Sequence, residues 1–138
     1  MSDIGAIKEW IEDCPLLDGD TINVDYLKDD IYSYSIDRTP SNPVLQRMID
    51  GTTEKRQITF DFTVQEPISS RAIDNLINSQ FCEDFMEWVT TKNRKKEFPE
   101  IDGAFKIECT SPGYVLTKTD TTAIYIIQMS FQYYKSLI

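Results

Sequence analysis

The sequence contains no histidine, so it lacks the usual general base near neutral pH and the commonest ligand of transition metals. Its 3 cysteines, Cys14, Cys82 and Cys109, lie far apart and include no Cys-x-x-Cys pair, so they predict neither a zinc site nor a disulfide framework. We interpret them as buried, reduced thiols. Since no serine or cysteine has a candidate base, we predict no catalytic, cofactor-binding or metal-ligating residue and expect a protein that is not an enzyme.

Glycine and long apolar runs are also scarce. With 5 glycines in 138 residues, the usual glycine-rich phosphate loop does not occur. No stretch approaches the roughly 18 apolar residues of a membrane-spanning helix. The first residues, Met1 to Gly5, lack the basic segment and apolar run of a signal peptide, so we expect the chain to stay in the cytoplasm of the cell that makes it. The length favours one domain, residues 1–138.

Basic residues are the minority, with 14 Lys and Arg against 23 Asp and Glu and a net charge of -9. Nucleic-acid binding needs clustered cations, and the one cluster, Arg94-Lys95-Lys96, ends a predicted helix, where it is explained by attraction to the helix C-terminus. Acidic pairs such as Glu83-Asp84 lie in polar segments and indicate solvated surfaces. Asp18-Gly19-Asp20 is only a weak calcium signal. Neither specific nucleic-acid recognition nor an anionic membrane surface is predicted.

Two segments have the apolar spacing of amphipathic helices. Ile4, Ile7, Ile11 and Cys14 predict a helix that begins near Asp3 and ends before the following proline. A second stripe, with Ser69 and Ser70 as candidate N-caps, runs to about residue 90 and contains Ile73, Leu76, Ile77, Phe81, Phe85, Trp88 and Val89. Asn78-Ser79 interrupts this stripe, so one helix or a pair of helices fits.

Alternation with a period of two predicts strands elsewhere. The clearest strand covers residues 57–65, in which the even positions are apolar and the odd positions polar. Further strands are predicted at 32–37, 105–109, 114–116 and from 123 to about 133. Residues 44–49 also fit one helical face, but the following Asp50-Gly51 is a hairpin signal and favours a strand. Residues 22–27 are ambiguous.

This order of elements predicts an α+β fold, with a mostly antiparallel sheet, an N-terminal helix, and a central helix or helix pair packed on one face. The inward positions predict a shared core of Phe60, Phe62, Ile127, Met129, Phe85 and Trp88. The polar faces of the long strands are expected to be wet or covered by a polar partner.

Six segments, taken in order along most of the chain, resemble one protein family. They are Ile7–Leu17, Pro40–Val44, Ile49–Gly51, Asn75–Phe81, Phe85–Val89 and Ser111–Tyr114. The family consists of small morphogenesis proteins from phages of Gram-positive bacteria, identified as minor capsid, head–tail joining or tail-terminator proteins. The chain departs from it at Thr52, where the family often has a second glycine after Asp50-Gly51, and this changes the hairpin tip.

The resemblance implies a tail terminator. Such a protein forms a ring, usually a hexamer, on the head-proximal end of the tail tube, stops its polymerisation and offers a joining surface to the head. The implied partners are further copies of the chain, the tail-tube protein, the sheath protein of a contractile tail and the head–tail connector, with no membrane and no cofactor. DNA would only pass through the lumen, and the acidic balance suits a lumen that repels it. The implied location is the virion tail, assembled in the host cytoplasm.

Two exposed turns are the candidate assembly surface, because hairpin tips and proline loops project from a sheet. They are the loop with Pro40, Asn42 and Pro43 and the hairpin tip with Asp50, Gly51, Thr52 and Thr53. For each residue, a simple exposed loop is an equally good interpretation. Alternatives for the whole chain are another connector or tail-tube-like subunit, the collar or terminator of a phage-tail-like bacteriocin, and, less favoured, a small non-metal enzyme or regulatory module.

Overall fold

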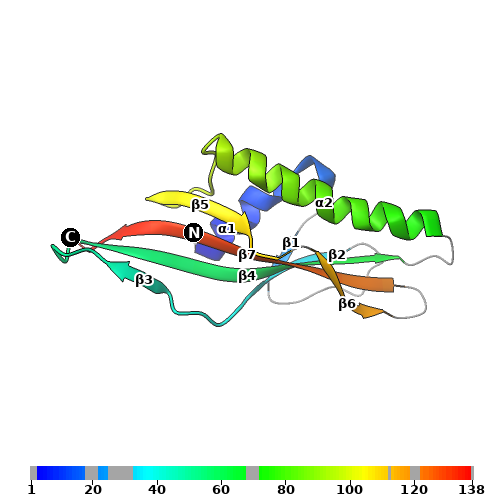
Figure 1. Ribbon diagram of the computed structural model, residues 1–138, viewed down its shortest axis with the longest axis horizontal. Helices are drawn as coiled ribbons and strands as arrows, with labels where there is room; N and C mark the ends of the chain where they lie inside the picture. The colour runs from blue at the N-terminus through cyan, green and yellow to red at the C-terminus, as the bar shows by residue number, and fades with distance from the viewer. Residues whose placement is uncertain are drawn as a thin grey trace.

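The structure is a computed structural model that describes residues 3–17, 22–24, 33–67, 72–111, 113–118 and 122–137. In these residues seven strands form one sheet, and two α-helices lie over one of its faces (Figure 1). The predicted α+β class is confirmed, as is the mostly antiparallel sheet with an N-terminal helix.

Two long strands form the centre of the sheet. β4 (Thr53–Pro67) and β7 (Thr122–Ser136) pair antiparallel over their whole length, from Thr53 opposite Ser136 to Pro67 opposite Thr122. The shorter strands are β1 (Ile22–Val24), β2 (Ser33–Arg38), β3 (Val44–Arg47), β5 (Ala104–Cys109) and β6 (Tyr114–Lys118). β2 and β3 pair with opposite ends of β4, β5 and β6 with opposite ends of β7, and β1 pairs parallel with β2. The β3–β4 hairpin and β5 therefore share one end of the sheet.

The core lies between the sheet and the helices. Phe60 pairs with Met129, Phe62 pairs with Ile127, and all four side chains are buried, as is Phe85 of the long helix. Each fully buried side chain of this size stabilises the fold by about 1.5–3 kcal/mol. The predicted core is confirmed for these five residues. The sixth, Trp88, is half-buried and packs at the margin of the core.

The N-terminal helix α1 (Asp3–Glu12) buries Ile7 and Ile11, and it is followed by the 3-10 turn η1 (Pro15–Leu17). Pro15 cannot continue an α-helix, because it lacks an N–H and its ring clashes with the preceding turn. The Trp10 ring lies 4.7 Å from the Trp88 ring, and its Nε1 donates to the Glu97 carbonyl at 2.9 Å. These contacts tie α1 to the long helix and to the segment that follows it.

The long helix α2 (Ala72–Arg94) runs without interruption, so the interpretation as two helices is wrong. Asn78 and Ser79 lie within it, because each lowers helix stability by only about half a kcal/mol relative to alanine. Burial of Phe85 and Val89 in the core outweighs this cost, and the Phe85 ring stacks 4.6 Å from that of Phe62.

The end of α2 is closed by its own backbone. Lys96 has a φ of 58°, Lys96 N donates to Asn93 O at 3.2 Å, and Glu97 N donates to Lys92 O at 3.0 Å. This is a Schellman motif with lysine at the position that favours glycine. The Asn93 side chain accepts a hydrogen bond from Ile107 N at 3.1 Å, so the helix end is fixed to β5. Arg94-Lys95-Lys96 thus lies at the helix C-terminus, as predicted.

The strand predictions hold, with differences at the ends. Residues 44–47 form a strand rather than a helix, and β1 occupies part of the ambiguous segment 22–27. β4 begins at Thr53 rather than near residue 57, because its polar first residues pair with both β3 and β7. The candidate caps Ser69 and Ser70 and the acidic turn with Asp18 and Asp20 lie outside the described residues.

Candidate assembly surface

The proline loop is exposed, as expected, and its backbone is hydrogen-bonded to the edge of the sheet. Residues 39–43 lie along the edge of β4, in the gap between β2 and β3. Thr39 N donates to Thr59 O at 3.0 Å, and Gln57 N donates to Pro43 O at 2.9 Å. The Gln57 side chain also donates to Asn42 O at 3.0 Å. Pro40, Asn42 and Pro43 are exposed, but their backbone is held against the sheet, and their part in assembly stays a prediction.

The hairpin tip between β3 and β4 is a tight, internally bonded turn. Gly51 N donates to Met48 O, and Met48 N donates to Thr53 O, both at 3.0 Å. Gly51 has a φ of 71°, a conformation that glycine adopts without strain. The Asp50 carboxylate accepts from Thr52 N at 3.0 Å and Thr52 Oγ1 at 2.8 Å, and these bonds lower the pKa of Asp50. The tip therefore presents a defined shape.

The tip is also joined to the end of β7. Thr53 pairs with Ser136, and Leu137 N donates to Thr52 O at 2.8 Å. Removing the tip residues would therefore remove contacts of the sheet itself. A point substitution of an exposed tip residue is a cleaner test of the surface than a deletion.

Exposed apolar side chains gather at this end of the sheet. Ile49, directly before the turn, is 109% exposed, Leu45 of β3 is 42% exposed and Leu137 is 47% exposed. Tyr134, at 41%, stacks on Phe105 with ring centroids 4.5 Å apart. Exposed apolar side chains on one end of a sheet are a candidate association surface. The predicted tip residues were Asp50 to Thr53, and Ile49 was not among them.

A buried carboxylate fixes the base of the hairpin. The Glu54 side chain is only 6% exposed and lies 3.5 Å from Arg47 Nε and 3.3 Å from Arg56 Nη2. Two guanidinium groups therefore share one acid, which would be costly to bury alone. The Arg47 side chain is 76% exposed, so most of its surface is open to a partner.

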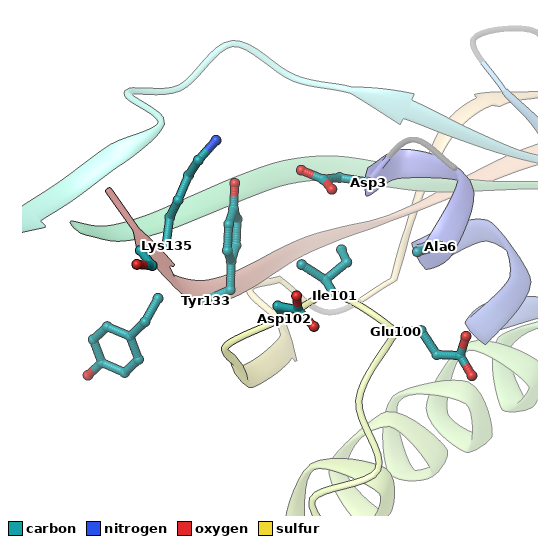
Figure 2. A pocket seen from close by; sticks show the side chains of 9 residues that line it. Asp3, Ala6, Glu100, Ile101, Asp102, Tyr133 and Lys135 are labelled. Carbon is teal, nitrogen blue, oxygen red and sulfur yellow. The ribbon is translucent and has the colours of Figure 1, made fainter. Parts of the chain in front are cut away.

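A hollow of about 450 Å³ lies at the same end, between α1, the loop before β5 and the end of β7 (Figure 2). Ile101 and Tyr133 line it together with the carboxylates of Asp3, Glu100 and Asp102. A hollow of about 180 Å³ shares Ala6 and Glu100 with it and continues along α1. The second hollow is lined by Ala6, Glu9, Trp10, Asp13, Phe98, Pro99 and Glu100. We call the two hollows together the acidic groove, because five carboxylate side chains and a single basic one, Lys135, line them.

The face of the sheet opposite the helices is mostly polar, although Ile126 of β7 also lies on it and is buried. Asp37 of β2 pairs in register with Asp61 of β4 and accepts from Ser35 Oγ at 2.9 Å and Thr63 Oγ1 at 3.0 Å. Burial, and then the Asp37 charge, raise the pKa of Asp61, whose Oδ1 has no hydrogen-bond partner. A hollow of about 320 Å³ beside Asp61 and Gln128 reaches Pro40 of the loop. This face can accept hydrogen bonds from a polar partner.

The described residues contain no group of three or more Cys, Asp or Glu side chains placed to hold a metal ion. In the same part of the chain, neither helix has the length and apolar character needed to cross a membrane. Compared with known proteins, the chain matches no family model and no curated protein.

Proposed function

We propose that this protein is a structural subunit of a phage tail, a terminator that assembles as a ring on the head-proximal end of the tail tube. The ring would stop polymerisation of the tube and offer the surface to which the head connector joins. Six copies is the number that the sequence resemblance implies.

The observation that carries the proposal is the exposed isoleucine on a rigid hairpin. Ile49 is fully exposed, and the turn that presents it is fixed by its own hydrogen bonds and by the end of β7. A monomer gains nothing from an aliphatic side chain held in water, whereas a subunit that buries it against a neighbour gains about 1.5–3 kcal/mol.

The polar face of the sheet supports contacts with the other partners. Its strands present Thr59, Asp61, Gln128 and their neighbours, so a tube or connector subunit can cover them without an aggregation-prone face in the free protein. A ring requires an interface between two different patches of the same chain that closes on itself. The net charge of -9 suits a lumen through which DNA slides.

The test uses the phage or tail-like particle whose genome encodes this chain. Deletion of the gene is expected to give tails of uncontrolled length that do not join heads, and a wild-type copy in trans should restore them. A copy that carries Ile49→Asp should fail to restore normal tails. A copy that carries Leu16→Asp, a change at an exposed leucine of η1, should restore them and is the control. Uniform, head-joined tails after the deletion would refute the proposal.

Mass measurement of the purified protein separates the related structural roles. A closed ring supports a terminator or connector, and tubes of indefinite length would indicate a tail-tube subunit instead. Electron microscopy of the particles then places a ring at the tube end or elsewhere.

A further inference from the structure

We propose that the β3–β4 hairpin of one copy docks in the acidic groove of a second copy. This inference rests on the proposed ring and names the two patches that would form its repeating interface. It also gives Ile49 a binding site, and the groove an occupant.

The hairpin combines exposed aliphatic side chains with positive charge. Ile49 and Leu45 are exposed, and Arg47 lies between them with its side chain 76% exposed. Residues 44–56 carry three basic residues and two acidic ones, so this segment is net positive in a chain whose net charge is -9. One of those acids, Glu54, is buried under its two arginines, which further favours a positive outer surface.

The groove has the complementary character. Its apolar lining includes Ile101, Tyr133 and Phe98, and its carboxylates are Asp3, Glu9, Asp13, Glu100 and Asp102. An exposed aliphatic side chain such as Ile49, next to a guanidinium such as that of Arg47, complements a site with an apolar lining and acidic sides. The larger hollow, about 450 Å³, leaves room for the tip side chain. Figure 2 shows Asp3, Asp102 and Glu100 arranged around Ile101 and Tyr133.

A second copy is the occupant that this chemistry favours, because the chain itself carries both halves of the contact. Hairpin and groove are different patches, so a subunit whose hairpin is bound still has a free groove for the next subunit. Repetition of such a head-to-tail contact closes into a ring when the rotation per subunit allows it.

Disulfide cross-linking between two single variants tests the contact directly. Ile49→Cys and Asp102→Cys proteins are mixed at high concentration and oxidised. The native thiols interfere little, because Cys14 and Cys82 are buried and burial raises the pKa of Cys109 to about 12. A mixed covalent dimer is expected. Ile49→Cys mixed with Leu16→Cys, an exposed site outside the groove, is the matched control and should give at least tenfold less product.

Charge exchange provides a second readout that does not depend on cysteine. Glu100→Arg with Asp102→Arg should weaken self-association about tenfold or more, and adding Arg47→Glu should restore part of it. Circular dichroism checks that each variant is folded. Cross-linking equal to the control, or self-association that neither set of charges affects, would overturn the docking.

The outcomes separate this inference from the function on which it rests. A ring at the tube end without the mixed covalent dimer refutes the docking and leaves the terminator proposal standing. Specific cross-linking within a closed dimer, in which two hairpins fill each other's grooves, supports the docking and contradicts the ring. A protein that stays monomeric at every concentration and is absent from particles refutes both.

Discussion

The two faces of the β4–β7 ladder differ in chemistry although they belong to the same two strands. On the helix-covered face, Phe60, Phe62 and Ile127 are buried, and Phe62 stacks on Phe85 of α2. On the open face, the alternate positions of β4 are polar, β7 contributes Gln128 and Ser130 beside the buried Ile126, and Asp61 Oδ1 and Ser130 Oγ are buried atoms without a hydrogen-bond partner. Strand pairing holds both faces together, and among the described residues the two helices cover only one of them.

This contrast separates stability from recognition. Apolar burial on the covered face contributes several kcal/mol at each large side chain, whereas a polar contact contributes about 0.5–1.5 kcal/mol net. Truncating a polar side chain of the open face should therefore cost less stability than truncating a large apolar side chain of the covered face. Substitutions at adjacent positions of one strand test this separation.

The largest difference is expected between Phe60→Ala and Thr59→Ala. Phe60 is buried in the core, so its truncation should lower the free energy of unfolding by about 3–5 kcal/mol. Thr59→Ala removes a hydroxyl that donates to Thr39 O at 3.1 Å and accepts from Thr39 Oγ1 at 2.7 Å, a loss of about 1–2 kcal/mol. Chemical denaturation of both variants measures the contrast, and equal losses would mean that the covered face does not dominate stability.

Thiol reactivity should show the same contrast along β5. Cys109 is only partly buried, unlike Cys14 and Cys82, so the expectation of three buried thiols is wrong for it. It packs against the core from the covered side, and burial, helped by the Glu108 charge, raises its pKa from about 9 to about 12. Its thiolate fraction at pH 8 is then about a thousandfold lower than for an ordinary thiol. Thr110→Cys in a Cys109→Ser background puts a thiol at the next, exposed position. Alkylation rates followed by mass spectrometry should be much lower for Cys109, and similar rates would contradict the raised pKa of this thiol.

The helical layer can be strengthened at its end. Lys96 adopts a left-handed conformation with a φ of 58°, which glycine adopts at lower cost. Lys96→Gly should therefore raise the free energy of unfolding by about 1 kcal/mol. Lys95→Gly, one residue earlier, lacks that benefit and should be destabilising. A loss of stability in Lys96→Gly would contradict the Schellman geometry.

The smallest expected effect is a pH-dependent gain on the open face. Because folding raises the pKa of Asp61, the folded state binds its proton more tightly than the unfolded state does. The stability contributed by this group is full below about pH 4 and is lost as the pH rises through the folded pKa. Asp61→Asn should thus raise the denaturation midpoint at pH 7 but not at pH 3. Asp37→Asn is the control, because it replaces a carboxylate that accepts two hydrogen bonds and should not stabilise.

The sequence was sufficient for the layers of the fold, because side-chain period reports directly which face is covered. Ile58 to Val64 predicted the central strand, and the stripe around Phe85 predicted the helix that covers it. It was not sufficient for the length of α2 or the start of β4. Whether Asn78-Ser79 stays helical and whether the polar residues after Thr53 join β4 depend on contacts with distant segments. The local sequence pattern carries no information about such contacts.

The candidate surface was predictable only in part. Asp50-Gly51 located the hairpin, but the proline loop is held to β4 by a hydrogen bond between Thr39 and Thr59, twenty residues apart. The acidic groove joins α1 to the loop at Glu100–Asp102 and to Tyr133. These segments are far apart in the chain, so only the folded arrangement brings them together.

The position of β7 has a consequence for the order of events during synthesis. This strand is central in the sheet, yet it follows every other described strand along the chain. Until β7 has emerged from the ribosome, one edge of β4 has no strand to pair with, and the apolar side chains that β7 contributes to the covered face are missing. Contacts between such distant segments form slowly, and an unpaired strand of this length invites pairing with other chains. We therefore expect chaperones to protect the nascent chain from aggregation until β7 has emerged from the ribosome.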